Sequence, residues 1–313
     1  DFSFANAYAP LDFGARRYCE ARVWSYFNMF TARGNEFLPY ILGDTDTPMP
    51  LFVKPDRKIS VQDVKNAMRD HYEGTPLDIS KDFGAGPYHT PYRLSPLSFK
   101  VGDKEYFNER PISTQQSGFV FVAQMRSTLP DAIGGVLWFG TDDANMTVFT
   151  PVYCCTDKVP VCYSRVDGAD YITFSWNSSF WIFNWVSNMV YPRYDLMIGD
   201  VRATQNELET TFNEAQEGIE SAAAKLLEKD PAKAKAFLTN YTNMTAQSAF
   251  DTWKRLGEFI IVKYNDGVVR KMKDGKFERN AIGQPAGVLR PGYPKEFLEE
   301  YVKQTGDRYK MPD

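Results

Sequence analysis

Two long runs with helical periodicity, residues 195–228 and 232–264, follow a series of short apolar strands, and this order restricts the fold more than any other feature of the chain. The runs are joined by Asp230 and Pro231, which suit the N-cap and the first position of a new helix. A helical hairpin of this length must bury one apolar side, and the preceding strands offer a surface for it. The order therefore predicts an α+β fold, in which an antiparallel sheet packs on long helices.

The strand region contains three β-rich runs, 117–125, 134–139 and 146–152, joined by short turns. Short connections between consecutive strands imply antiparallel pairing. The first run is apolar at nearly every position from Gly118 to Ala123, which predicts that both of its faces are covered. Just upstream, the turn Gly102-Asp103-Lys104 predicts a hairpin between two further short strands.

The first third of the chain has a helical pattern over residues 14–30 and a second helix start after Ser60. Asp63 stands three residues after Ser60, as in a capping box, and we expect this helix to reach Tyr72 and end at Gly74. A short amphipathic helix is expected over 294–304. We therefore expect one domain with four parts: a helical and loop-rich segment (1–96), antiparallel strands (97–175), the helical hairpin (176–266) and a tail (267–313).

Composition narrows the classes of function. The net charge of −4 argues against a nucleic-acid partner, and no apolar run is long enough to span a bilayer. The chain has two histidines and four cysteines without a C-x-x-C pair, so neither a metal site nor a cofactor is expected. The cysteines are expected to be buried free thiols, and the disulfide status of three of them stays open: Cys154, Cys155 and Cys162.

A polar cluster lies where the second helix is expected to give way to a loop: Arg69, Asp70, His71 and Glu73. Such a position is typical of binding sites. Arg69 suits a substrate carboxylate, whereas Asp70 or Glu73 suits an amine. The alternative is a capped helix end, whose charges pair with one another and brace the next loop.

Further polar residues flank the apolar strand: Gln115 and Gln116 precede it and Arg126 follows it. Because unsatisfied polar groups beside a buried strand are unfavourable, these side chains should bond to something specific, either substrate or supporting groups, or else be exposed at the strand ends. At the end of the next run, Asp142 and Asp143 are interpreted as an ordinary acidic turn, because no further oxygen ligands follow at calcium-loop spacing.

Several runs together resemble the Ntn-hydrolase dipeptidases, which are cysteine peptidases related to penicillin V acylase and bile-salt hydrolases. The resemblance extends over most of the chain and is most specific around His71. The matching runs are PLDFGA (10–15), RYCEARVW (17–24), MRDHYEGTP (68–76), AGPY (85–88), ERPIS (109–113), FVAQMR (121–126) and GGVLWFG (134–140).

This resemblance implies part of an αββα sandwich and a dipeptide substrate. Members of the family attack with a processed N-terminal cysteine, whose α-amino group serves as the general base. Cys19 is internal and cannot supply that amine. We therefore expect the chain to correspond to the middle and C-terminal part of such an enzyme, with the nucleophile and the missing N-terminal part upstream and this part inactive alone. By the same resemblance, substrate contacts are expected from Arg69, Asp70, His71, Glu73, Gln115, Gln116 and Arg126.

Two other functions remain open at this point. One is an amidase that acts on another small acyl-amide, and the other is a non-catalytic peptide-binding module. The long polar helix faces also leave room for a homo-oligomer. The preferred dipeptide and the compartment stay open, with export slightly favoured over the cytoplasm.

Overall fold

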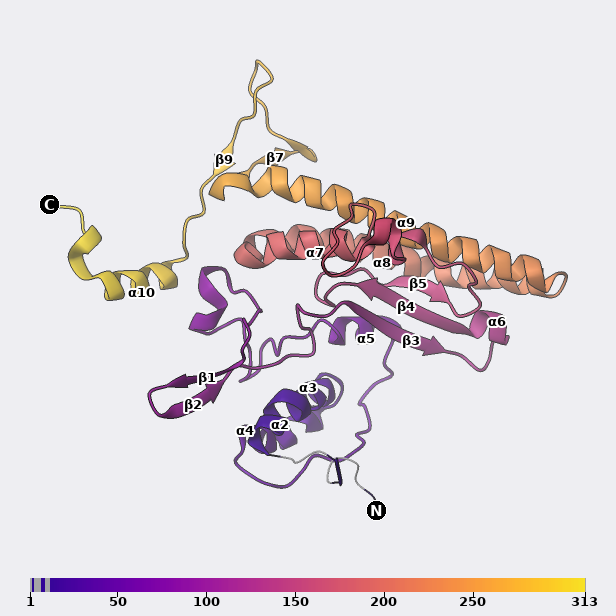
Figure 1. The fold of residues 1–313 in the computed structure, drawn as a ribbon, viewed down its shortest axis with the longest axis horizontal. Helices are drawn as coiled ribbons and strands as arrows, with labels where there is room; N and C mark the ends of the chain where they lie inside the picture. The colour runs from indigo at the N-terminus through magenta and orange to yellow at the C-terminus, as the bar shows by residue number, and fades with distance from the viewer. Residues whose placement is uncertain (1, 3–6, 9–11, 313) are drawn as a thin grey trace.

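The computed structural model describes residues 2, 7–8 and 12–312, and it has the α+β architecture that the sequence predicts (Figure 1). A three-stranded sheet lies against a layer of helices. The strands are β3 (Phe119–Met125), β4 (Gly135–Thr141) and β5 (Thr150–Tyr153), all antiparallel and in the order β3-β4-β5. The helices that cover it are α7 (Ser179–Val190), α8 (Tyr194–Leu227) and α9 (Pro231–Tyr264).

The main core lies between the sheet and these helices. Val120 and Val122 of β3 and Val136 and Trp138 of β4 are buried on the helix side. The predicted start of α9 is confirmed, because the Asp230 side chain accepts hydrogen bonds from the backbone amides of residues 232 and 233.

The opposite face of the sheet is apolar and exposed. Burial alternates along β3, so that Phe119, Phe121 and Met125 are 58%, 47% and 61% exposed. The prediction that both faces of this strand are covered is therefore wrong for the described residues. The run is apolar throughout, as in a strand buried on both sides, but only one of its faces has a layer packed on it.

A second, smaller core forms in the N-terminal part. The predicted helix over 14–30 is present in three pieces: α2 (Phe13–Ala15), a π-helical turn (Arg16–Glu20) and α3 (Ala21–Phe30). It packs with α4 (Leu38–Leu42). The core residues are Ala21, Trp24, Tyr40, Ile41, Tyr72, Leu77 and Ile79.

Helix α5 (Val61–Ala67) connects the two cores. It begins with the predicted capping box of Ser60 and Asp63. The prediction that it reaches Tyr72 and ends at Gly74 is wrong, because the α-helix ends at Ala67 and Tyr72 has a left-handed backbone with φ of +67°. The residues beyond α5 instead form an irregular loop, which carries the polar cluster away from the helix axis.

The remaining elements lie toward the outside of the fold (Figure 1). The predicted hairpin consists of β1 (Ser98–Val101) and β2 (Lys104–Phe107), and a short helix, α6 (Asp131–Gly134), precedes β4. The tail contains the two-residue strands β6 (Val269–Arg270), β7 (Met272–Lys273), β8 (Lys276–Phe277) and β9 (Val288–Leu289), followed by α10 (Lys295–Thr305).

Candidate functional site

The loop that follows α5 lies between the two cores, and Arg69, near its start, faces the main core. Arg69 is 8% exposed and forms a bidentate ion pair with Glu209 of α8, with Nη2 to Oε1 at 2.5 Å and Nη1 to Oε2 at 3.3 Å. Its guanidinium also donates to the carbonyls of Ala144 and Thr147. These partners occupy Arg69 within the fold, so the structure does not place it where it can bind a substrate carboxylate.

Asp70 faces the N-terminal core. Its Oδ2 accepts a hydrogen bond from the Ser25 hydroxyl at 2.7 Å, and its backbone carbonyl accepts from the Ser113 amide at 3.0 Å. Burial raises the pKa of Asp70 to about 6, and the Ser25 hydrogen bond opposes that rise. The Asp70 backbone therefore joins the loop to the segment that contains Gln115 and Gln116.

His71 is buried, with 1% exposure, and the Glu73 carboxylate contacts both its backbone amide and its imidazole ring. One Glu73 oxygen contacts His71 Nδ1 at 3.0 Å, and the other accepts from the His71 amide at 2.7 Å. Burial raises the pKa of Glu73, but the hydrogen bonds and charge of His71 outweigh this and lower it to about 2. The Glu73 side chain is 52% exposed, so it braces the loop from its solvent side.

The two acids after β4 are buried, so their interpretation as an ordinary acidic turn is wrong. Asp142 accepts from Asn184 and Ser187 of α7 at 2.9 and 2.8 Å, and Asp143 accepts from the Tyr191 hydroxyl at 2.8 Å. Burial and the proximity of the two carboxyls raise the pKa of Asp142. These acids hold the end of β4 to α7 and to Tyr191 just after it, and no residue near them in the sequence indicates that role.

Polar residues of α8 complete this buried network. Arg202 donates to the backbone and side chain of Asn145, and Gln205 donates to the carbonyls of Asn145 and Thr147. Arg202, Gln205, Glu209 and Asn213 recur at spacings of three or four residues, which places them on one face of the helix. This polar stripe on a helix expected to pack on the sheet is a signal that could have revealed the network from the sequence.

Gln115 and Gln116 lie together in a pocket of about 290 Å³ beside the loop of Asp70. Gln115 donates to the Arg93 carbonyl at 3.1 Å, and Tyr72 donates to the Arg110 carbonyl at 2.8 Å. The lining residues are Ile79, Pro91, Arg93, Ser95, Leu97, Glu109, Arg110, Pro111, Thr114, Gln115 and Gln116. We call this hollow the Arg93 pocket.

Arg126 lies elsewhere: it follows β3 and is not among the residues that line the Arg93 pocket. It forms a bidentate ion pair with Glu220 of α8, with both distances 2.7 Å. The structure therefore places Asp70 beside the segment that carries Gln115 and Gln116, whereas Arg126 is paired with Glu220 of α8. Arg93 and Glu109, which line the pocket, were not predicted as site residues, because isolated charges in a proline-rich loop carry no spacing signal.

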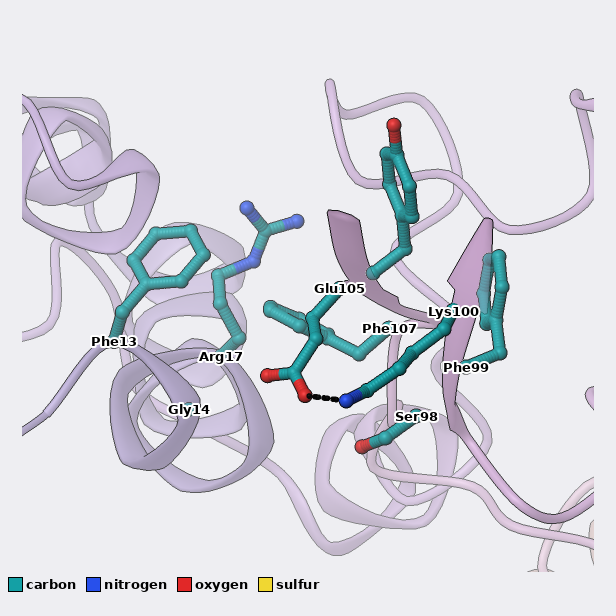
Figure 2. Close-up of a pocket in the computed structure, with 9 residues that line it drawn as sticks. Phe13, Gly14, Arg17, Ser98, Phe99, Lys100, Glu105 and Phe107 are labelled. Atoms are coloured by element: carbon teal, nitrogen blue, oxygen red, sulfur yellow. Dashed lines mark ion pairs between the residues drawn. The ribbon is translucent and has the colours of Figure 1, made fainter. Parts of the chain in front are cut away.

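A second hollow, of about 620 Å³, lies between α2 and the β1–β2 hairpin (Figure 2). Its ion pair, Lys100 to Glu105 at 3.0 Å, joins side chains that are 70% and 77% exposed, and such pairs contribute little. Arg17 points between the rings of Phe13 and Phe107, and it also pairs with Glu109 of the Arg93 pocket. Among the described lining residues of this hollow, Arg17 is mostly buried, whereas Lys100 and Glu105 are largely exposed. The Arg93 pocket holds Gln115 and Gln116 of the predicted site residues, so we take it as the candidate site.

The four thiols give no sign of a nucleophile within the described residues. Cys19 and Cys154 are exposed, Cys155 is partly buried, and burial raises the pKa of Cys162 to about 12. All four are free, so the expectation of buried thiols holds for Cys162 and not for Cys19 or Cys154. Among residues 2, 7–8 and 12–312, no group of three or more His, Cys, Asp or Glu side chains could hold a metal ion.

Comparison with known proteins identifies the family. Residues 1–207 match the model of "Peptidase family C69", so the chain belongs to that peptidase family. In the described part of the chain, no helix is both long and apolar enough to cross a membrane.

Curated relatives are named as dipeptidases. "Probable dipeptidase" of Salmonella dublin is 31% identical over 153 residues, which are 49% of this chain and 30% of that protein. "Probable dipeptidase B" of Lactococcus lactis subsp. lactis is 27% identical over 247 residues, 76% of this chain and 45% of that protein. "Dipeptidase A" of Lactobacillus helveticus is 26% identical over 137 residues, 44% of this chain and 24% of that protein. The chain thus spans less than half the length of each.

Proposed function

We propose that this chain is part of a thiol dipeptidase. Its membership of peptidase family C69, together with relatives named as dipeptidases, is the observation that carries the proposal. A cysteine thiolate would attack the carbonyl carbon of the peptide bond, the C–N bond would break, and the amine would leave with a proton. Water would then hydrolyse the thioester and restore the thiol.

In this proposal the nucleophile is not one of the chain's own four cysteines. By the resemblance set out above, it is an N-terminal cysteine that lies upstream and uses its α-amino group as the base. The described thiols support this view, because no hydrogen bond or ion pair joins any of them to His71 or His89. The relatives are also long enough to contain such a segment, since the chain covers 30% and 45% of two of them.

The exposed face of the sheet supports the proposal that part of the enzyme lies outside these 313 residues. Phe119, Phe121 and Met125 form an apolar surface on β3, and Leu137 and Phe139 extend it onto β4. Apolar surface of this kind is normally covered in a folded protein. We propose that strands supplied from outside these 313 residues pack on it and complete the sandwich that the resemblance implies.

The substrate is proposed to bind where the loop of Asp70 meets the Arg93 pocket. Gln115 and Gln116 line that pocket and can donate to or accept from a peptide group. Asp70 bonds to Ser25 and, through its carbonyl, to the Ser113 amide, whereas His71 and Glu73 bond to each other, so we assign these residues the positioning of the pocket wall. Arg69 and Arg126 are assigned structural ion pairs in place of the carboxylate contact that the sequence suggests.

The test is a substrate panel for the full-length protein from its native source. We expect hydrolysis of dipeptides such as Ala-Ala, and at least tenfold lower kcat/KM for Ala-Ala-Ala and for phenoxyacetyl or acyl-glycine amides. Preference for the acyl-amides would replace the proposal by an amidase. Dipeptide binding without turnover of any substrate would replace it by a non-catalytic peptide-binding protein.

A further inference from the structure

One end of the exposed sheet face carries a further hollow, of about 500 Å³, which the proposed function does not use. Its wall combines the start of β3, the end of β4, the segment 162–171 and the start of α7. Its volume is within the range of small-molecule sites. We call it the aromatic pocket after six of its lining residues: Phe119, Phe139, Tyr163, Tyr171, Phe180 and Trp181.

The six rings form two contacting groups. In the first group, Phe139 stacks on Phe119 with ring centroids 6.0 Å apart and meets Tyr163 at 5.2 Å. In the second group, Phe180 contacts the rings of two other residues edge-on, at 5.3 and 5.2 Å. Rings in these orientations present both faces and edges to an incoming group, which suits another aromatic ring or a large aliphatic side chain.

Hydrogen bonds hold two of these rings in place before any ligand binds. The hydroxyl groups of Tyr163 and Thr150 form a hydrogen bond of 2.7 Å, which joins the first group to β5. The Trp181 indole donates to the carbonyls at both ends of the 170–173 turn, at 3.0 and 2.8 Å. Because these rings are already ordered, a ligand that contacts them loses little of its binding free energy to ordering side chains.

Tyr171 belongs to that turn and reaches the start of β3. The residue is 74% exposed, yet a methyl group in place of the Gly118 hydrogen would stand 2.6 Å from the Tyr171 hydroxyl. The absence of a side chain at Gly118 therefore leaves room for the Tyr171 ring beside the strand. Tyr171 is thus a wall of the pocket that can be substituted without disturbing the buried core.

The aromatic pocket adjoins the Arg93 pocket along the chain. Gln116 lines the Arg93 pocket and Gly118 lines the aromatic pocket, and two residues of backbone span at most about 7 Å. The turn between the two hollows is closed by the Ser117 amide, which donates to the Thr114 carbonyl at 3.1 Å. A dipeptide bound at Gln116 is therefore close enough to place one of its side chains in the aromatic pocket.

The rim of the aromatic pocket differs from the rest of the exposed sheet face. Arg165 and Asp170 line it and form an ion pair at 3.1 Å, in which the Arg165 side chain is 74% exposed. An apolar wall with a few polar groups is typical of a ligand pocket. Phe121 and Met125 are not among its lining residues, and they belong to the part of the face on which we place the missing strands.

We propose that the aromatic pocket receives one side chain of the substrate, so that the enzyme prefers dipeptides that contain a large aromatic or aliphatic residue. This inference rests on the proposed function, because it places the peptide group of the substrate beside Gln116. Burial of a phenylalanine side chain against the rings raises kcat/KM roughly 10- to 100-fold over the value for alanine. Tyr171 contacts that side chain and determines specificity.

Turnover by the full-length protein is the first arm of the test. The substrates are Phe-Ala, Ala-Phe and Ala-Ala, and we expect the better phenylalanine substrate to exceed Ala-Ala by the factor above. Tyr171→Ala should lower kcat/KM for that substrate roughly 10-fold and change it less than twofold for Ala-Ala, whereas Tyr171→Phe should keep the preference. Ile172→Ala is the matched control, because Ile172 is 94% exposed in the same turn and does not line the pocket.

Gly118→Ala tests the same wall without removing a ring. Its methyl group displaces the Tyr171 hydroxyl, so we expect the preference for the phenylalanine substrate to fall at least threefold. In Tyr171→Ala the hydroxyl is already gone, so adding Gly118→Ala to that variant should cause no further loss. Equal losses from Gly118→Ala in both backgrounds would show that Gly118 does not act through Tyr171, and would overturn the assignment of that ring.

Calorimetry with L-phenylalanine and L-alanine is the second arm, and it measures the pocket without turnover. We expect L-phenylalanine to bind at least tenfold more tightly than L-alanine, and Tyr171→Ala to remove most of that difference. If this holds but no dipeptide is hydrolysed, the assignment of the pocket stands and the proposed function falls.

The converse results overturn the inference and leave the proposed function in place. One is that dipeptides are hydrolysed but neither phenylalanine substrate exceeds Ala-Ala. Another is that Tyr171→Ala lowers kcat/KM by the same factor for all three substrates, as expected if the rest of the polypeptide fills the pocket. A third is that Ile172→Ala reduces the preference as much as Tyr171→Ala does, which would assign the effect to the turn and not to the ring.

Discussion

Arg69 and Glu209 form a buried ion pair that joins the loop after α5 to the middle of α8, with Nη2 and Oε1 2.5 Å apart. Glu209 also accepts from the Phe149 amide at 2.9 Å, so a single carboxylate links the loop, the helix and the start of the last strand. The position of His71, two residues further on, therefore depends on a contact between residues 140 positions apart.

Removing one partner of this pair should be strongly destabilising. Glu209→Gln leaves the Arg69 charge buried without a counter-ion, and we expect the free energy of unfolding to fall by about 3–5 kcal/mol. Glu207→Gln, on the exposed side of the same helix, is the control and should change stability by less than about 0.5 kcal/mol. Chemical denaturation measures both, and equal effects would contradict the role assigned to the pair.

Asp70 should make stability depend on pH in a specific window. Its pKa is about 6 in the folded protein against 3.8 ordinarily, so the folded protein binds more protons than the unfolded chain between these values. Stability from this group is therefore present below pH 4 and is lost as the pH rises through 6. Asp70→Asn keeps an acceptor for Ser25 and removes the buried charge, so it should stabilise the protein at pH 7 by up to about 3 kcal/mol.

The same comparison at low pH checks the cause. At pH 4 the Asp70→Asn protein and the unaltered protein should have nearly equal midpoints of unfolding. A difference between them that stays constant from pH 4 to pH 7 would show that the effect does not come from ionisation of Asp70.

Glu73 should act on the pocket indirectly, through His71. Glu73→Gln weakens the two contacts that hold His71, so we expect a lower kcat/KM for every substrate, by roughly 3- to 10-fold, as for loss of about 1 kcal/mol. The factor should be the same for Ala-Ala and N-acetyl-Ala-Ala. A loss confined to the substrate with a free amine would instead make Glu73 the residue that binds the ammonium group.

The exposed face of β3 should behave as core in the full-length protein. If another layer packs on it, Phe121→Ser should lower the free energy of unfolding by about 2–4 kcal/mol. Phe52, which is 83% exposed in a loop, provides the matched control, and Phe52→Ser should have little effect. Similar small effects at both positions would show that the face is not covered.

Local sequence signals predicted the elements well because their causes are local. Ser60 and Asp63 form their capping box within four residues, and Asp230 caps the helix that follows it. Hydrophobic periodicity likewise located the three strands and the helical hairpin. The strand Phe119–Met125 was predicted correctly, but the burial of its two faces was not. An apolar pattern shows that a face is suited to burial, but it does not show that another layer covers that face.

The candidate site was harder to predict because its contacts join distant parts of the chain. Helix α5 ends early where Asp70 bonds to Ser25, 45 residues away, and nothing near Asp70 in the sequence indicates that partner. Arg69 resembled a free substrate ligand because Glu209 could not be placed opposite it. Arg93 was overlooked because its contact with Asp82, 11 residues away, and its two nitrogens without a partner among the described residues become evident only in the folded chain.

The most direct test of the thiol dipeptidase proposal is to treat the full-length protein with iodoacetamide, follow Ala-Ala hydrolysis over time, and identify the alkylated residues by mass spectrometry. We expect activity to be lost in step with alkylation of one processed N-terminal cysteine outside these 313 residues, whereas modification of Cys19 or Cys154 does not follow the loss. Inactivation that follows Cys19, or hydrolysis that survives complete alkylation, would contradict the proposal.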